Sequence, residues 1–253
     1  MKIGIKDAQE IKLMREGGKI LGIILHELGK HIRPGMTGMD LDVMAEKMME
    51  EYGVLPSFKG YRGFPNVACI NINDQVVHGI PNNRPFEEGD KVTIDCGVIH
   101  GGFHTDSAIT KGVGMISQDL TRLIQTAEKA LKKAIETAKP GIRIRTISGV
   151  IQDIIEKNGY SVVQDLIGHG IGTNLHEDPQ VPNYRDTEPG PILQPGMTIA
   201  IEPIFTMGRS AIKTLKDNWT IVTVDRSLAV QVEHTIAITD KGCEILTKRP
   251  DEL

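Results

Sequence analysis

Residues 34–53 read PGMTGMDLDVMAEKMMEEYG, and residues 140–159 read PGIRIRTISGVIQDIIEKNG. Aligned without a gap, the two stretches agree at the opening Pro-Gly, at one glutamate and at the final glycine. Further pairs follow in the same order along the chain: His78-Gly79-Ile80 with His169-Gly170-Ile171, Asp95 with Glu202, and Asp106 with Glu233. A long period that occurs twice indicates two similar α+β halves, related by an approximate twofold axis around a shared sheet.

The spacing of apolar residues predicts that each half begins with helices and continues with strands. Asp7 and Glu10 form a capping-box pattern at the start of the first helix, and Pro34-Gly35 ends it. The expected helices cover about 7–32, 40–52, 119–138 and 144–157. Alternating β-branched segments predict strands in residues 66–110 and again in MTIAIEPIF, WTIVTV and AVQVEHTIAIT. We therefore expect one α+β domain over residues 1–253, with its duplicated halves at about 7–112 and 117–248.

The composition is that of a globular protein. The chain has 253 residues, of which 40% are hydrophobic and 25% are charged, and this excludes collagen-like and disordered classes. A formal net charge of −4 provides no overall basic field for nucleic acid or an anionic membrane. Three distant cysteines indicate reduced thiols, and the apolar run at 20–25 is shorter than a membrane span or a signal core. We expect a cytoplasmic protein.

Four acidic residues stand in apolar strand segments, two in each half. A single carboxylate of this kind most simply faces solvent. A buried carboxylate is costly unless it is paired or binds a metal, so four in corresponding places favour convergence on cations. The four residues are Asp95, Asp106, Glu202 and Glu233.

Two histidines add a different ligand type. His169 and His176 flank the glycine-punctuated GIGTNL, which predicts an irregular loop or strand rather than a helix. A buried structural role is the commoner fate of an isolated histidine, but the repeated His-Gly-Ile motif, shared with His78, weighs against it. His26, His31 and His100 have no such partners and are expected to be surface or packing residues.

Carboxylates and an imidazole around two divalent ions fit a site in which metals roughly 3.5–4 Å apart generate and share a hydroxide. Hydrolysis is the reaction that such a site favours. Competing machinery is missing from the sequence, because Asp178-Pro179-Gln180 after His176-Glu177 breaks the HExxH pattern, and neither GxSxG nor GxxxxGK[ST] occurs.

Several motifs taken together resemble a known family. NDQVVHGIP from residue 73, IDCGV, HTDSA, GHGIGTNLHEDPQVPNY, GMTIAIEPI and VQVEHT, in this order, resemble the methionine aminopeptidases, in particular the bacterial type I form. The resemblance covers nearly the whole chain. It implies the pita-bread fold and the removal of N-terminal methionine, before a small second residue, through a metal-bridging hydroxide.

The resemblance also implies a role for each motif residue. Asp106 and Glu233 would bridge two metal ions, His169 would complete the shell of one, and Glu202 would also transfer protons. His78 and His176 would contact the scissile peptide and stabilise the tetrahedral intermediate. The implied metal ligands are Asp95, Asp106, His169, Glu202 and Glu233, and Co, Mn, Fe or Zn would suit them.

A methionine pocket is implied by the same resemblance. Trp219, which is the single tryptophan, offers a flat apolar wall that suits a thioether. Leu175 stands where many family members carry an aromatic residue. The substrate-binding residues would be Phe58, Tyr61, Phe64, Cys69, His78, Leu175, His176 and Trp219.

The implied partners are nascent polypeptide N-termini, with the ribosome surface left open as a further contact. We expect a monomer with no membrane attachment and no specific nucleic-acid site.

Prolidase and aminopeptidase P resemble the same catalytic half, but these enzymes carry an additional N-terminal domain for which the residues before VACINI leave no room. Type II methionine aminopeptidases carry a helical insertion that is absent here. A noncatalytic peptide-binding module of the same fold would have lost ligands, whereas all five are present.

Overall fold

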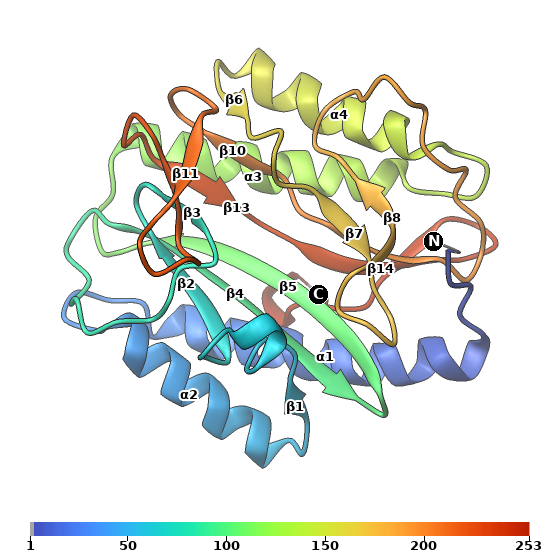
Figure 1. Ribbon diagram of the computed structural model, residues 1–253, viewed down its shortest axis with the longest axis horizontal. Helices are drawn as coiled ribbons and strands as arrows, with labels where there is room; N and C mark the ends of the chain where they lie inside the picture. The colour runs from blue at the N-terminus through green and yellow to red at the C-terminus, as the bar shows by residue number, and fades with distance from the viewer. Residues whose placement is uncertain (1–2, 253) are drawn as a thin grey trace.

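The computed structural model describes residues 3–252, in which four α-helices and a set of antiparallel strands form an α+β structure (Figure 1). The helices are α1 (Ala8–Lys30), α2 (Gly38–Glu51), α3 (Gln118–Thr137) and α4 (Ile144–Lys157), with short 3-10 turns η1 (Tyr61–Gly63) and η2 (Pro250–Glu252). The predicted order of helices, strands, helices and strands is confirmed.

The strands of the first half are β1 (Leu55–Pro56), β2 (Ala68–Ile72), β3 (Gln75–Val77), β4 (Lys91–His100) and β5 (Phe103–Gly112). Those of the second half are β6 (Ser161–Val162), β7 (Gly168–Gly170), β8 (Glu177–Val181), β9 (Thr198–Ile201), β10 (Ile204–Thr206), β11 (Ile212–Thr214), β12 (Ile221–Thr223), β13 (Ala229–Gln231), β14 (His234–Ile238) and β15 (Cys243–Ile245). The main ladders run β1-β4-β2 with β5 on β4, and β15-β14-β9-β7-β8.

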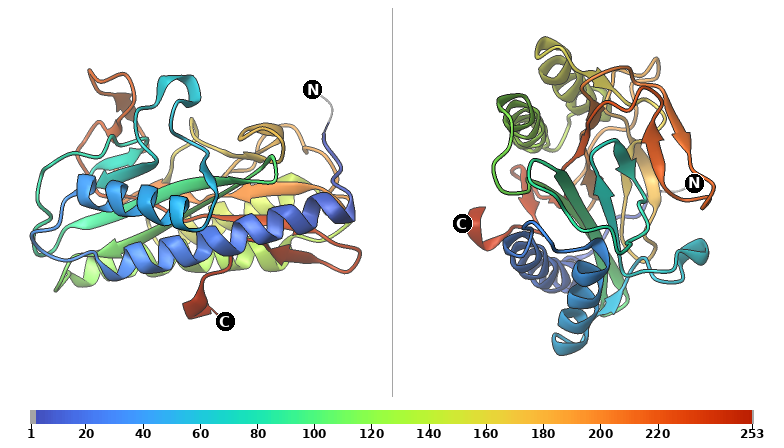
Figure 2. Two further views of the ribbon diagram at one scale, coloured as in Figure 1. Left: turned by 90° about the horizontal axis from the view of Figure 1, so that it is seen from below. Right: turned by 90° about the vertical axis from the view of Figure 1, so that its left-hand side faces the viewer.

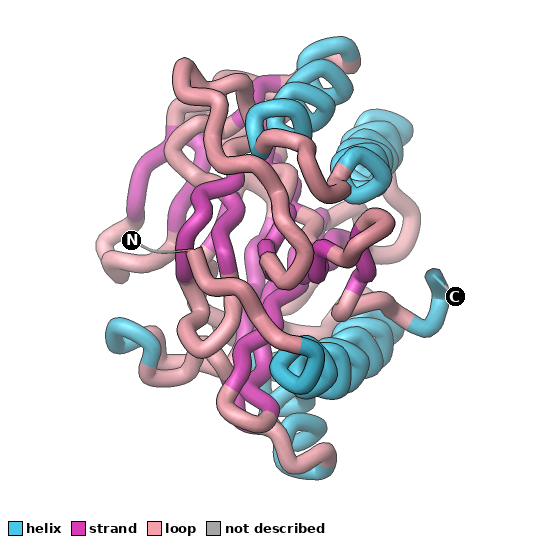
Figure 3. Tube along the Cα trace, turned by 90° about the vertical axis from the view of Figure 1, so that its right-hand side faces the viewer, coloured by secondary structure: helices cyan, strands magenta, loops and turns pink. Residues whose placement is uncertain are grey.

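Helices cover one face of the strands. Helix α1 packs on β4 and β5, and α3 packs on β5, β9 and β13. On the opposite face, η1 and the β11–β12 hairpin rise above the strands (Figure 2). Figure 3 shows the strands between the main helices and this loop-rich side. The face of the strands opposite the α-helices is therefore covered by loops and by these short elements.

Local sequence signals account for the helix boundaries. The Asp7 side chain accepts hydrogen bonds from the Gln9 and Glu10 amides, and Glu10 completes the predicted capping box. Thr37 and Asp40 form a second capping box at α2, which therefore begins slightly before the predicted position. Gly53, with a φ of 67°, follows α2 in the left-handed conformation that glycine adopts most easily.

Each helix pair closes its own hydrophobic core. Leu21, Leu25 and Leu41 belong to a buried cluster beneath α1 and α2, and a second cluster beneath α3 and α4 includes Leu123 and Ile151. Burial of these apolar side chains stabilises the strands on which the polar site is built.

The two halves meet along β5 and the segment from β13 to β14. The Glu233 amide donates to the Ala108 carbonyl oxygen at 3.0 Å, so main-chain hydrogen bonding continues from one half into the other. The Thr235 hydroxyl accepts from the Asp106 amide at 2.9 Å and donates to the Asp106 carbonyl at 2.7 Å. This junction determines how close Asp106 and Glu233 lie.

Lys91 at the start of β4 is fully buried, and its Nζ donates only to uncharged oxygens: the Asn71 carbonyl (3.2 Å), the Gln75 carbonyl (3.1 Å) and the Thr93 hydroxyl (3.4 Å). Burial lowers the pKa of Lys91 to about 7, although Asp74 and Asp90 act in the opposite direction. The ammonium form is therefore disfavoured in the folded protein.

The contribution of Lys91 to stability should consequently rise with pH above about 7. Between the lowered pKa and the ordinary value of 10.5, the unfolded chain binds one proton more than the folded chain. The contribution of Lys91 to the free energy of unfolding then increases by about 1.4 kcal/mol per pH unit. Lys91→Met removes this group, so the comparison is the unfolding free energy of the wild type minus that of the variant. We expect this difference to rise by about 1 kcal/mol between about pH 7.5 and about pH 8.5. Urea unfolding at both pH values measures this, and a difference that does not change with pH would contradict it.

Candidate metal centre and active site

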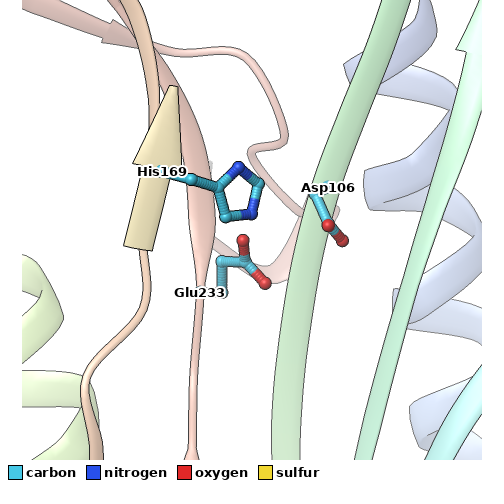
Figure 4. Close-up of side chains that lie close together, drawn as sticks. All are labelled: Asp106, His169 and Glu233. Atoms are coloured by element: carbon cyan, nitrogen blue, oxygen red, sulfur yellow. The ribbon is translucent and has the colours of Figure 1, made fainter. Parts of the chain in front are cut away.

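A cavity of about 400 Å³ lies where the two halves meet, and it brings together the five residues predicted to bind metal. They come from five places in the chain: Asp95 in β4, Asp106 in β5, His169 in β7, Glu202 directly after β9, and Glu233 directly before β14. Ligand atoms of Asp106, His169 and Glu233 all lie within 4.8 Å of one another (Figure 4). The arrangement is that of a potential metal site.

The four carboxylates are almost completely buried, with exposed fractions of 2–9%. Burial raises the pKa of Asp95 to about 7. Burial, and then repulsion from neighbouring carboxylates, raises the pKa values of Asp106, Glu202 and Glu233 well above their ordinary range. Without a cation, the folded protein therefore opposes ionisation of the whole cluster.

The cluster also has unused hydrogen-bonding capacity. One buried oxygen on each of Asp95, Asp106 and Glu233 accepts no hydrogen bond from the described residues. No Lys or Arg side chain in residues 3–252 forms an ion pair with the cluster. The nearest basic group is the imidazole of His169, whose Nε2 lies 3.7 Å from Glu202 Oε1. Buried oxygens without partners are uncommon in folded proteins, and convergent carboxylates are typical ligands of divalent cations. The residues present thus fit a divalent metal centre.

His169 is held in the form that binds metal. Its Nδ1 lies 2.9 Å from the Gly170 carbonyl oxygen, which can only accept, so Nδ1 carries the hydrogen and Nε2 keeps its lone pair. Burial lowers the pKa of His169 to about 4. The neutral imidazole can therefore offer Nε2 to a metal at neutral pH.

The other two histidines of the predicted site also line the cavity. The hydroxyl of Tyr61 lies 2.9 Å from His176 Nδ1, and the ring centroids of His169 and His176 are 4.2 Å apart. Burial, followed by the nearby charges of other histidines and an arginine, lowers the pKa of His176 to about 3. His78 adopts a φ of 56°, a backbone conformation uncommon outside glycine, and the neighbouring Gly79 amide donates to Asn71 Oδ1. Both side chains are neutral groups held at the edge of the carboxylate cluster.

An apolar pocket opens from the same cavity. The rings of Phe64 and Trp219 meet edge to face, with their centroids 5.1 Å apart. The rings of Trp219 and His78 also meet edge to face, with their centroids 6.3 Å apart. Leu175, which is 3% exposed, contributes an aliphatic surface. All eight residues predicted to bind substrate line the cavity: Phe58, Tyr61, Phe64, Cys69, His78, Leu175, His176 and Trp219.

Sequence reasoning missed Gln231. Its side-chain amide donates to Asp95 Oδ2 at 3.2 Å and to Glu202 Oε2 at 3.4 Å, so it is the uncharged group that links two carboxylates. The available signal was its position two residues before Glu233, because strand alternation places such residues on one face. Arg62, Asp165, Leu166 and Ile167 also line the cavity and were not singled out.

The antiparallel strands, the helices on one face and the buried acidic cluster fit a metal-dependent hydrolase. A model of metallopeptidase family M24 matches residues 12–240, and the chain belongs to this family. Methionine aminopeptidase 1 of Bacillus subtilis is 46% identical over 243 residues, covering 96% of this chain and 98% of the relative. The methionine aminopeptidase of Clostridium perfringens is 49% identical with the same coverage.

Solved structures extend the comparison to the fold. The methionine aminopeptidase of Thermotoga maritima superposes with a TM-score of 0.96 at 41% identity, over 98% of this chain and all of the other. The prolidase of Pyrococcus horikoshii has a TM-score of 0.79 at 27% identity, and the match covers 63% of that chain. The predicted α+β pita-bread fold and the predicted metallopeptidase class are confirmed.

Removal of a central carboxylate should strongly weaken metal binding without unfolding the protein. Glu233→Gln keeps the shape of the side chain and removes its charge, so affinity for Mn²⁺ should fall by about a hundredfold or more. Isothermal titration of metal-free protein measures this affinity. Glu136→Gln, on the exposed face of α3, is the control and should bind as the wild type does. Unchanged metal binding in Glu233→Gln would exclude this residue as a ligand.

Proposed function

We propose that this M24 peptidase removes the N-terminal methionine from polypeptides whose second residue is small. The observation that supports the proposal is one cavity that contains both the carboxylate–imidazole cluster and an apolar aromatic pocket. Relatives that match nearly the whole chain are named methionine aminopeptidases, which agrees with this activity.

The metal centre in this proposal holds two divalent ions. Asp106 and Glu233 would hold these ions together with Asp95, His169 and Glu202. Bound there, divalent ions would polarise the peptide carbonyl and lower the pKa of a water molecule, and so supply the nucleophile. Mn, Fe, Co and Zn all accept oxygen ligands with one imidazole, and the choice among them depends partly on their availability.

The remaining steps belong to side chains of the chain itself. In the tautomer in which the Tyr61 hydroxyl donates to His176 Nδ1, Nε2 of His176 carries a hydrogen and can donate it to the carbonyl oxygen as negative charge develops. His78 orients the scissile peptide from the other side. The Glu202 carboxylate accepts a proton from the attacking water molecule and returns it to the leaving nitrogen.

The apolar pocket selects the first residue of the substrate. Methionine is flexible and polarizable, and its sulfur is attracted to aromatic rings, so a wall built by Phe64, Trp219 and Tyr61 suits it. Cys69 is 4% exposed, and burial raises the pKa of its thiol well above the ordinary value. Cys69 therefore acts as a small apolar surface rather than as a nucleophile.

The cellular setting is part of the proposal. Nascent polypeptide N-termini are the substrates, the ribosome surface is a further contact, and the enzyme works as a cytoplasmic monomer. Among residues 3–252, no helix has both the length and the apolar character needed to cross a membrane. The domain organisation is a further part of the proposal: the two α+β halves form a single catalytic domain that arose by duplication.

Peptide cleavage tests the substrate assignment directly. With Mn²⁺ or Co²⁺ added, Met-Ala-Ser and Met-Gly peptides should be cleaved at least about tenfold faster than Met-Lys and Met-Leu peptides, because a narrow second subsite excludes long side chains. Liquid chromatography of released methionine measures the rates. Ala-Pro is the comparison substrate for prolidase activity, and faster cleavage of Ala-Pro than of Met-Ala-Ser would replace the proposal with a prolidase function.

The proposed role of His176 makes a separate prediction. A group that assists mainly the transition state affects kcat more than KM, so His176→Ala should lower kcat by about a hundredfold or more with little change in KM. Metal content, measured by mass spectrometry, should stay at the wild-type ratio. His100→Ala, which removes an outlying histidine that contacts Glu16, is the control and should keep wild-type kinetics. Loss of bound metal in His176→Ala would instead make His176 a ligand.

A further inference from the structure

The last residues of the described chain lie behind the carboxylate cluster. Asp106 and Glu233 face the cavity, and the next residues along the chain, Ser107 and His234, point to the opposite face because strand side chains alternate. Ser107 is 0% exposed and His234 is 3% exposed, so both sit in the covered layer between the strands and the helices. The η2 turn, which ends the described chain, lies on this helix-covered side (Figure 2).

Arg249 reaches into this layer with its guanidinium group. Nη1 donates to the Ser107 hydroxyl at 3.3 Å. Nη2 lies 3.1 Å from His234 Nε2, which is also 3.3 Å from Glu252 Oε1. Glu252 accepts from Nη2 at 2.6 Å and from the Arg249 amide at 2.9 Å, and this holds the arginine in place. One arginine thus contacts the residues that follow two of the predicted metal ligands.

The contact continues into the segment between β13 and β14, which carries Glu233. The Ser107 hydroxyl donates to the Glu233 carbonyl oxygen at 2.7 Å. On the other side of His234, Nδ1 lies 2.9 Å from the Thr247 hydroxyl, which also accepts from the Thr235 amide at 3.1 Å. The C-terminal segment is therefore hydrogen-bonded to both sides of the junction between β5 and β14.

Helix α1 holds the C-terminal segment from behind. A Cβ atom on Gly18 would lie 2.4 Å from the Leu246 carbonyl oxygen, and one on Gly22 would lie 2.5 Å from the Lys248 carbonyl oxygen. Only glycine permits so close an approach, although glycine weakens a helix interior by about 1 kcal/mol. The segment before Arg249 is thus packed directly against the longest helix.

We propose that Arg249 is a positioning residue for the metal centre. Its guanidinium fixes Ser107 and, through it, the main chain of Glu233, so that Asp106 and Glu233 are presented to the same ions at the correct separation. The inference rests on the proposed function only in taking Asp106 and Glu233 as metal ligands. Arg249 does not line the cavity that contains the carboxylate cluster. It acts through the main chain of β5 and of the segment directly before β14.

The test compares metal binding by three purified full-length variants with that of the wild type. Arg249→Met keeps the apolar stem and removes the donors, whereas Arg249→Lys keeps the charge but loses the two-pronged geometry. Arg15→Met is the matched control, because Arg15 forms a two-pronged ion pair with Glu244 that ties α1 to β15 away from the ligands. The readouts are the dissociation constant of Mn²⁺ from calorimetry and the visible absorption spectrum of the Co²⁺-loaded protein.

We expect Arg249→Met to weaken Mn²⁺ binding by about ten- to a hundredfold and to alter the Co²⁺ spectrum. Arg249→Lys should fall between Arg249→Met and the wild type, and Arg15→Met should match the wild type in both measurements. A general packing defect would lower thermal stability in Arg249→Met and Arg15→Met alike and would leave metal affinity unchanged. Wild-type affinity and a wild-type spectrum in folded Arg249→Met would overturn the proposal.

If Arg249→Met does not fold, Ser107→Ala tests the same link, since it removes only the hydroxyl between Arg249 and Glu233. Weaker Mn²⁺ binding by Ser107→Ala supports the proposal, and unchanged binding overturns it. Failure of the proposed function would have another signature, namely a wild-type protein that binds metal but does not cleave Met-Ala-Ser. The metal affinities of the Arg249 variants still decide the present inference in that case.

Discussion

Burial of four carboxylates in one place is the constraint on which the rest of this structure depends. Like charges in a poorly solvated site repel each other and lose hydration, and the raised pKa values of Asp106, Glu202 and Glu233 express both effects. The two hydrophobic cores must stabilise the fold against this cost, and a bound divalent cation would remove most of it. Such a site gains metal affinity from the same repulsion that makes the metal-free protein less stable.

The junction between the halves gives this cluster its geometry. Hydrogen bonds between β5 and the β13–β14 segment bring Asp106 and Glu233 together, and Thr235 and Ser107 fix the main chain on either side. Gln231 spans Asp95 and Glu202 from within the cavity. The carboxylates are therefore held in strands or directly beside them, and well-supported ligands are what precise metal coordination requires.

Specificity has a different structural origin. The pita-bread fold is shared with prolidases at a TM-score of 0.79, so the fold and the acidic cluster do not by themselves choose a substrate. In the proposed function the choice depends on the loops above the strands, where η1 supplies Tyr61 and the β11–β12 hairpin supplies Trp219. The Tyr61 hydroxyl also contacts His176, so one loop residue connects the apolar pocket with the proposed acid–base machinery.

Much of this organisation could be predicted from the sequence, because it is encoded locally. Capping residues determine where α1 begins, apolar periodicity determines the faces of the four helices, and the repeated motifs single out Asp95, Asp106, Glu202 and Glu233. Resemblance to a family then suggested a role for each residue. The contacts of Gln231 and Arg249 and the pairing of Tyr61 with His176 emerged only in the tertiary structure. Thr235 and Asp106 are bonded although they stand 129 residues apart, and no local pattern specifies such a contact. Sequence periodicity states which face of a strand a residue occupies, but only the packing of distant strands decides which other residues it meets there.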